Sequence, residues 1–328
     1  MKPCLHWKLV TASIALTVVL SPAGAQTPRK ALYRVGILLP SDPSSPYRGA
    51  FVDGMRKIGY QEAREYVIEF RYAEGKLDRL PTLAAELVEL KVDVIVLGSI
   101  PAALAAQKAT KSIPIVVAAA GDFVGNGLVA SLEQPGGNIT GLDEVVPGLA
   151  GKRLRLLSEA VRLRSSVAIL SSATGPTHAK QTQDVESTAE SLGIRLMVMR
   201  VSDIKDFEGA FEAMASEKAS ATVVFSGVLT NVHRKRIAEL AAQYRLPVIH
   251  WSEAYVTSGG LMYYGPNLPG MFRRAAAFVD KVLKGASPSV LPVEYPQQFE
   301  LIINLKTAKE LGLTIPKTLL EKADRLIE

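Results

Sequence analysis

The sequence predicts an α/β protein with two lobes, each built around a parallel β-sheet. From Tyr33 onward, short apolar runs alternate with stretches of helical period, which is typical of parallel strands joined by right-handed helical crossovers. The alternation occurs in two series, separated by the turn-rich segment 134–141. The chain has 328 residues, 48% of them hydrophobic and 21% charged, which is enough for two lobes and excludes a disordered or fibrous protein.

The first 25 residues have the features of a cleavable secretory signal peptide. Lys2 and Lys8 precede an apolar segment at 9–20, which small residues follow. A positive start, an apolar segment of about a dozen residues and small residues at the cleavage site define such a signal. A membrane-spanning helix would need roughly 20 apolar residues. We expect cleavage between Ala25 and Gln26, export to the periplasm of a Gram-negative bacterium, and no stable membrane insertion.

The sequence lacks the side chains on which most metal sites depend. Cys4 is the only cysteine and is removed with the signal, so the mature chain has no disulfide framework. The three remaining histidines are scattered, which argues against a zinc site. We expect His178 and His233 to be solvated or to cap helices, and His250 to lie nearest a pocket. No metal or other cofactor is predicted.

Motifs for catalysis and for nucleic acid binding are also missing. The chain contains no phosphate-binding loop, no dinucleotide-binding glycine motif and no nucleophile elbow. The net charge of +6 comes without a cluster of Lys or Arg. The sequence therefore predicts neither an enzyme nor a nucleic acid partner.

The first lobe is predicted from four apolar strands and the helices between them. The strands are expected at 34–39, 66–72, 92–97 and 114–118. The first helix is expected to begin at Ser45-Pro46, with Ser45 as its cap, and to end at Gly59. A second helix carries leucines on one face at 80–90, and an alanine-rich third helix begins at Ser99.

The second lobe repeats this pattern. Its strands are expected at 167–170, 194–199, 222–225 and 247–250, with helices marked by residues 149–160, 177–191, 207–214 and 237–244. Breaks at 259–260, 265–270 and 286–296 follow, then a helix at 305–311 and an amphipathic tail from Pro316. Several breaks favour two lobes joined by several crossings over two domains on one linker.

Ligands of parallel sheets bind beyond the carboxyl ends of the strands, where the N-termini of helices converge. This rule selects as ligand-binding candidates Ser41, Asp42, Tyr47, Gly98, Ser99, Ile100, Ala119, Gly121, Asp122, Ser171, Ser172, Ala173, Ser226, Gly227, Trp251, Ser252 and Glu253, to which Tyr264 is added from the second crossing. Hydroxyls and backbone N–H groups suit a carboxylate, Asp122 or Glu253 suits an ammonium, and Trp251 or Tyr47 suits a flat side chain. An amino acid or a similar small zwitterion is a coherent ligand.

Several segments resemble a bacterial family of ABC-transporter substrate-binding proteins, often labelled as tryptophan/tyrosine transport components. The resemblance lies in Asp122 and in segments 51–54, 59–60, 68–75, 127–132, 135–141, 259–266, 299–309 and 311–316. It implies a type I periplasmic binding fold, with two Rossmann-like lobes, three hinge crossings and closure on a ligand in the cleft. The crossings would lie at about 141–146, 261–265 and 292–300. Lobe 1 would comprise 31–142 and about 264–295, and lobe 2 would comprise 146–260 and about 298–328, after the signal peptide at 1–25.

The function implied is that of the periplasmic component of an ABC importer, capturing a small molecule by clamshell, or Venus flytrap, closure. The ligand would be an amino acid, with aromatic amino acids among the options. The partners would be a permease and its ATPase, and the receptor itself would be a monomer. Two alternatives stay open. One is a ligand sensor that signals to a periplasmic receptor, and the other is a two-lobed transferase or epimerase.

Overall fold

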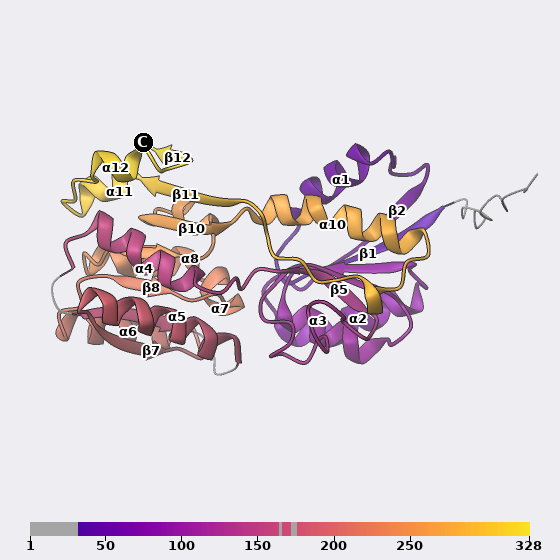
Figure 1. Cartoon of the computed structure of the whole chain (residues 1–328), viewed down its shortest axis with the longest axis horizontal. Coiled ribbons are helices and arrows are strands. Elements are labelled where there is room, and N and C mark those ends of the chain that lie inside the picture. The colour runs from indigo at the N-terminus through magenta and orange to yellow at the C-terminus, as the bar shows by residue number, and fades with distance from the viewer. Residues whose placement is uncertain (1–31, 164–165, 172–175) are drawn as a thin grey trace, which may run out of the picture. The chain divides into compact units, whose positions relative to one another are not determined.

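The computed structural model describes residues 32–163, 166–171 and 176–328, excluding the side chains of 176 and 177. Two β-sheets with helices on their faces make up this part of the chain (Figure 1). The predicted signal peptide and the candidates Ser172 and Ala173 lie outside the described residues.

The first sheet contains five parallel strands in the order β2-β1-β3-β4-β5. The strands are β1 (Tyr33–Leu39), β2 (Tyr66–Tyr72), β3 (Val94–Leu97), β4 (Ile115–Ala120) and β5 (Ile139–Asp143). Its helices are α1 (Tyr47–Lys57), α2 (Leu80–Glu89), α3 (Ile100–Ala109) and α10 (Leu268–Leu283), with short 3₁₀ turns at Leu77–Arg79 and Pro288–Val290.

Alternate residues of the central strands pack against different helix pairs. Val94 and Val96 of β3 belong to the hydrophobic cluster that contains α1 and α10, whereas Ile95 and Leu97 belong to the cluster of α2 and α3. Successive side chains of a strand point to opposite faces, so both faces of this sheet are covered. That burial explains the continuous aliphatic runs from which these strands were predicted.

Helices α1 and α10 approach closely, although more than 200 residues separate them in the sequence. Gly54 lies at their contact, where a Cβ atom would collide with the carbonyl oxygen of Arg273. Segment 268–283 therefore packs on the first sheet, although the strand before it belongs to the second.

The second sheet contains seven strands in the order β12-β11-β10-β9-β8-β6-β7. The strands are β6 (Ser166–Ser171), β7 (Arg195–Arg200), β8 (Thr222–Val224), β9 (Val248–His250), β10 (Met262–Pro266), β11 (Phe299–Asn304) and β12 (Arg325–Ile327). The helices are α4 (Leu149–Ala160), α5 (Pro176–Leu192), α6 (Asp206–Ser216), α7 (Val228–Val232), α8 (Arg234–Gln243), α9 (Ala254–Thr257), α11 (Leu305–Glu310) and α12 (Lys317–Leu320). All pairings are parallel except that of β10 with β11.

Four strands, β5, β10, β11 and β12, were not predicted from the sequence. Segment 139–143 looked like part of a turn because Pro135, Gly136 and Gly137 precede it, yet it pairs with β4 and is buried. The tail contributes β11 and β12, and the antiparallel β10–β11 pair corrects the expectation of purely parallel sheets. The two-lobed α/β class with parallel-dominated sheets is confirmed.

In the described residues, the chain passes between the sheets after β5, after β10 and before β11. Backbone hydrogen bonds tie these segments together. Glu294 N donates to Gly141 O over 2.9 Å, Asp143 N donates to Glu294 O over 2.9 Å, and Asn267 N donates to Gln298 O over 3.4 Å. The chain connections between the lobes therefore run side by side. Strand β10 pairs in the second sheet as far as Pro266, and the residue-level lobe boundaries stay a prediction.

Candidate ligand-binding site

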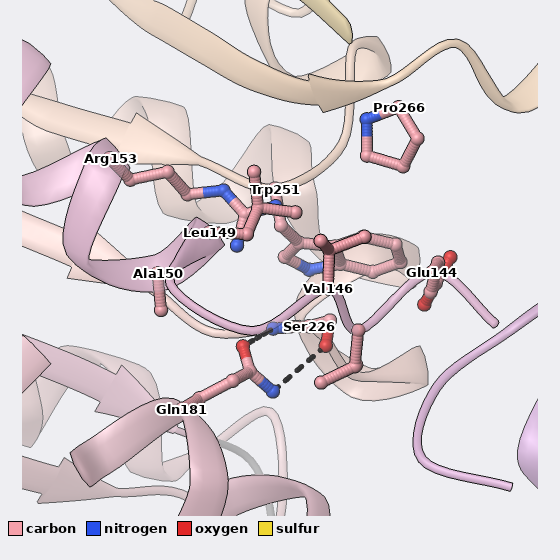
Figure 2. A pocket seen from close by; sticks show the side chains of 10 residues that line it. Glu144, Val146, Leu149, Ala150, Arg153, Gln181, Ser226, Trp251 and Pro266 are labelled. Atoms are coloured by element: carbon pink, nitrogen blue, oxygen red, sulfur yellow. Dashed lines mark hydrogen bonds between the residues drawn. The ribbon is translucent and has the colours of Figure 1, made fainter. Parts of the chain in front are cut away.

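A small pocket that is partly open to solvent lies at the carboxyl ends of β8, β9 and β10 (Figure 2). The pocket is lined by Glu144, Val145, Val146, Leu149, Ala150, Arg153, Gln181, Ser226, Trp251 and Pro266. Of the sequence-predicted candidates, Ser226 and Trp251 are in this lining, and the position agrees with the rule for parallel sheets.

Trp251 forms a fixed aromatic wall of the pocket. Its side chain is held by a 3.1 Å hydrogen bond from Nε1 to Thr230 Oγ1, and the residue is 8% exposed. The ring of His250 stacks beside it at a centroid distance of 6.0 Å, and His250 stacks in turn on Tyr255 at 4.8 Å. Burial lowers the pKa of His250 to about 3, so this imidazole is neutral. His250 does not line the pocket and instead supports Trp251 from behind.

Glu144 brings an acidic group to the pocket from the first crossing. Its backbone N–H donates to Ala120 O over 2.8 Å, while its half-buried carboxyl group has no hydrogen bond or ion pair with the described residues. Burial raises its pKa to about 7, Asp143 adds to the rise and Arg153 opposes it. A carboxyl group in this condition is available to a cationic group of a ligand.

Arg153 is 4% exposed and reaches the same pocket from α4. Its Nε donates to the carbonyl oxygen of Tyr264 over 2.7 Å, which anchors the guanidinium to β10. Burial lowers its pKa to about 10, so it remains charged at neutral pH. This charge partly balances that of Glu144.

Helix α5 supports the pocket through Gln181. Gln181 Nε2 donates to Ser226 Oγ over 3.0 Å, and Ser226 N donates to Gln181 Oε1 over 3.2 Å (Figure 2). Ser171 Oγ and His178 Nδ1 are 2.5 Å apart, and burial lowers the pKa of His178. His178 is thus hydrogen-bonded and half-buried, not solvated or capping as expected, and His233 packs its ring on Phe207.

Asp122 joins the loop after β4 to helix α5. The residue is 2% exposed, with a positive φ of 55°, and its Oδ1 accepts from Lys180 Nζ at 2.5 Å and from Gly125 N at 3.1 Å. The backbone N–H groups of Asp122 and Phe123 donate to the carboxylate of Asp143 over 2.9 and 3.0 Å. Asp122 therefore already has a cationic partner from α5.

Tyr47, at the start of α1, stacks on Phe272 of α10 with a centroid distance of 4.7 Å and an interplanar angle of 14°. Burial raises the pKa of Tyr47 to about 12, Glu144 adds to the rise and Arg234 opposes it. The phenol is therefore protonated and close enough to both charges to be affected by them. Gly98 leaves room for this pair, because a Cβ atom there would be 2.5 Å from Phe272 Cζ.

Other candidates have structural partners. Ser99 caps α3 by accepting from Ala102 N over 3.2 Å, and Glu253 forms an ion pair with Arg325 at 2.5 Å. The ring of Tyr264 stacks on Phe299 with a centroid distance of 6.1 Å. The candidates Ser41, Asp42, Ile100, Ala119, Gly121, Ser171, Gly227 and Ser252 lie at or beyond strand ends and do not line this pocket.

The strand-end rule missed the lining residues on the first crossing and on helices α4 and α5. A signal for one of them was present, since Arg153 lies four residues after Leu149 and four before Leu157 on the apolar stripe of α4. A charged residue on a buried helical stripe indicates a special environment.

Among the described residues, His, Cys, Asp and Glu side chains form no group of three or more that could hold a metal ion. A search of the same residues finds no helix with the length and apolar character needed to cross a membrane.

Residues 35–327 match the family described as ABC transporter substrate binding protein. The protein belongs to this family. A Clostridioides difficile relative named "Tyrosine-binding protein" is 26% identical over 263 residues, which cover 80% of this chain and 75% of the relative. The resemblance found in the sequence is confirmed, and substrate-binding proteins of ABC transporters act outside the cytoplasmic membrane.

Two solved structures are similar over nearly the whole of this substrate-binding protein. A conserved domain protein from Vibrio cholerae has a TM-score of 0.82 with 27% identity, covering 90% of this chain and 100% of that one. An ABC domain in complex with L-Trp from Streptococcus pneumonia has a TM-score of 0.81 with 26% identity, covering 90% and 99%. The fold is that of type I periplasmic binding proteins.

Proposed function

We propose that this protein is the periplasmic solute receptor of an ABC importer and that its ligand is an aromatic amino acid. The observation that carries the proposal is that one pocket contains both a fixed indole, Trp251, and a carboxyl group, Glu144, that has no partner among the described residues. The relative named for tyrosine binding and the similar structure with L-Trp support the same class of ligand.

The pocket offers complementary partners for two parts of such a ligand. An aromatic side chain would pack on Trp251 and against the apolar side chains of Val146 and Leu149. The ammonium group would pair with Glu144 and hold its carboxylate in the ionised form. A rigid aromatic wall costs little entropy on binding, since Trp251 is already ordered by its hydrogen bond to Thr230.

Closure would follow from contacts with both lobes. Trp251 belongs to the second lobe, Glu144 to a crossing and Tyr47 to the first lobe. A ligand that touches all three only in one arrangement shifts the equilibrium toward that arrangement. The closed receptor, a monomer without cofactor or catalytic activity, would then deliver its ligand to a permease driven by an ATPase.

A fluorescence titration tests the ligand class directly. Trp7 and Trp251 are the two tryptophans, and cleavage of the predicted signal peptide removes Trp7. Indole fluorescence of the chain starting at Gln26 should therefore report on the pocket alone. L-tyrosine should change this emission, calorimetry should give the same affinity, and Trp251→Ala should abolish measurable binding of L-tyrosine and L-tryptophan.

X-ray scattering with and without ligand tests closure. The radius of gyration should fall when ligand is added. Binding without compaction would contradict the clamshell mechanism, and failure of every aromatic amino acid to bind would contradict the ligand class.

A further inference from the structure

Four buried polar atoms of residues outside the pocket lining have no hydrogen-bond partner among the described residues. They are Ser41 Oγ, Ser45 Oγ, Asn231 Oδ1 and Arg234 Nε. Buried polar groups in folded proteins are nearly always satisfied by protein, water or ligand. A cluster of such atoms therefore indicates a missing polar partner.

The four atoms come from two elements that contact each other. Ser41 and Ser45 lie between β1 and α1, whereas Asn231 and Arg234 lie at the junction of α7 and α8. The first segment is tied to Gly75, whose N–H donates to Pro40 O over 2.7 Å. A Cβ atom on Gly75 would lie 3.6 Å from Val232 Cγ1, next to Asn231.

Donors predominate in this cluster. Arg234 uses Nη1 to donate to Asn231 O over 2.9 Å, which leaves Nε unpaired. Ser45 was expected to cap α1, but no side chain caps this helix and the Ser45 hydroxyl is unpaired. A guanidinium N–H with two free hydroxyls is a donor set suited to a carboxylate.

Nearby carboxylates form no hydrogen bond or ion pair with these donors in the described residues, although, in addition to hydrogen bonds from Ser44, the charge of Arg234 helps to lower the pKa of Asp42. Asp42 Oδ1 accepts from Ser44 N over 2.8 Å, and these contacts with Ser44 lower the pKa of Asp42. Glu253 is paired with Arg325. A bound carboxylate would complete the cluster.

Tyr47 connects this cluster to the pocket. It follows Ser45 by two residues, and its hydroxyl responds to the charges of both Glu144 and Arg234. Both charged groups therefore lie near this phenol. Asn231 of the cluster also directly follows Thr230, which accepts the hydrogen bond from Trp251 Nε1 over 3.1 Å. An α-amino acid carries its carboxylate and its ammonium on the same carbon atom, so it needs a donor set and an acceptor set in such proximity.

We propose that Arg234, Ser41 and Ser45 form the receptor for the α-carboxylate of the ligand. The assignment rests on the proposed function, because it concerns the carboxylate of the same ligand. Asn231 Oδ1, an acceptor next to these donors, adds to Glu144 in receiving the ammonium group. The side chain of the ligand then extends toward Trp251.

The test compares L-tryptophan with tryptamine, which has the same side chain and ammonium but no carboxylate. Arg234→Gln should weaken L-tryptophan binding roughly 10- to 100-fold, as expected for lost charged hydrogen bonds. Tryptamine binding should not change. The double variant Ser41→Ala/Ser45→Ala should show the same selective loss of L-tryptophan binding. It replaces Arg234→Gln in the test if that variant fails to fold. Arg236→Gln is the matched control, because Arg236 lies on the same helix and pairs with Glu208.

Unchanged L-tryptophan affinity in both variants would overturn the proposal, and so would equal losses for L-tryptophan and tryptamine. A wild-type protein that binds neither L-tryptophan nor L-tyrosine would instead reject the proposed function, and the carboxylate receptor with it. The two failures are therefore distinguished by the wild-type titration.

Discussion

Lys180 Nζ lies 2.5 Å from Asp122 Oδ1, and this ion pair joins helix α5 of the second lobe to the loop after β4 of the first. Asp122 is buried, whereas the Lys180 side chain is 59% exposed. The hydrogen bond to Asp122 raises the pKa of Lys180. A contact between lobes that involves a buried carboxylate favours the arrangement in which the lobes meet.

Lys180→Met should weaken ligand binding a few-fold, because the arrangement that buries Asp122 loses its cationic partner. The exposure of Lys180 limits the effect to about 1 kcal/mol. Calorimetric titration measures it, with Lys108→Met on the exposed face of α3 as the control. Equal affinities in wild type and Lys180→Met would show that the pair does not contribute to closure.

Glu144 should make binding of an ammonium ligand depend on pH. Its pKa of about 7 in the free protein means that it becomes ionised as the pH rises through neutrality. Only the ionised form attracts an ammonium, so affinity should rise from about pH 6 to about pH 8 and then level off. Titrations over this range should show that Glu144→Gln binds weakly and independently of pH. A pH dependence that survives in Glu144→Gln would assign it to another group.

Gly54→Ala should destabilise the fold by about 1 to 3 kcal/mol, since the added methyl group meets the backbone of α10 at Arg273. Gly49→Ala in the same helix meets nothing within 4 Å and should stabilise by up to about 1 kcal/mol. Urea denaturation measures the free energy of unfolding, which should fall in Gly54→Ala and rise in Gly49→Ala. A stabilised Gly54→Ala would mean that α1 and α10 do not pack as described.

Gly98→Ala should reduce affinity without touching the pocket. The new methyl group would displace the Phe272 ring, on which Tyr47 stacks. Gly137→Ala, in open surroundings, should bind like wild type. Ligand affinity and thermal stability should both be measured. A variant that is less stable but binds with normal affinity would show that the packing of Phe272 does not affect ligand binding.

The sequence was informative wherever one local rule determined the structure. Strands β1, β3, β4, β6, β8 and β9 are short apolar runs covered on both faces, so hydrophobic pattern alone located them. The edge strands β2 and β7 are more exposed but were also predicted from their sequence pattern. Strands β10 and β12 depend on pairing with distant partners, and β5 depends on β4. Local pattern does not encode such pairing, which explains why they were missed.

The candidate site was likewise predicted only where local sequence was sufficient. Trp251 and Ser226 follow strands directly, so topology was enough to find them. Glu144, Arg153 and Gln181 approach from a crossing and from two helices, and their meeting depends on how these elements pack. Ser45 was given a capping role from local sequence, yet its hydroxyl does not cap α1 and has no hydrogen-bond partner among the described residues.

The hydrogen bonds of Glu294 with Gly141 and Asp143 have a mechanical consequence. Two segments that share a ladder of backbone bonds cannot twist independently without breaking those bonds. Asn267 bonds to Gln298 of the same returning segment, so the second connection is coupled to it as well. We therefore expect the three connections to bend together if the lobes move, so that a membrane partner would meet a receptor whose connections act as one hinge.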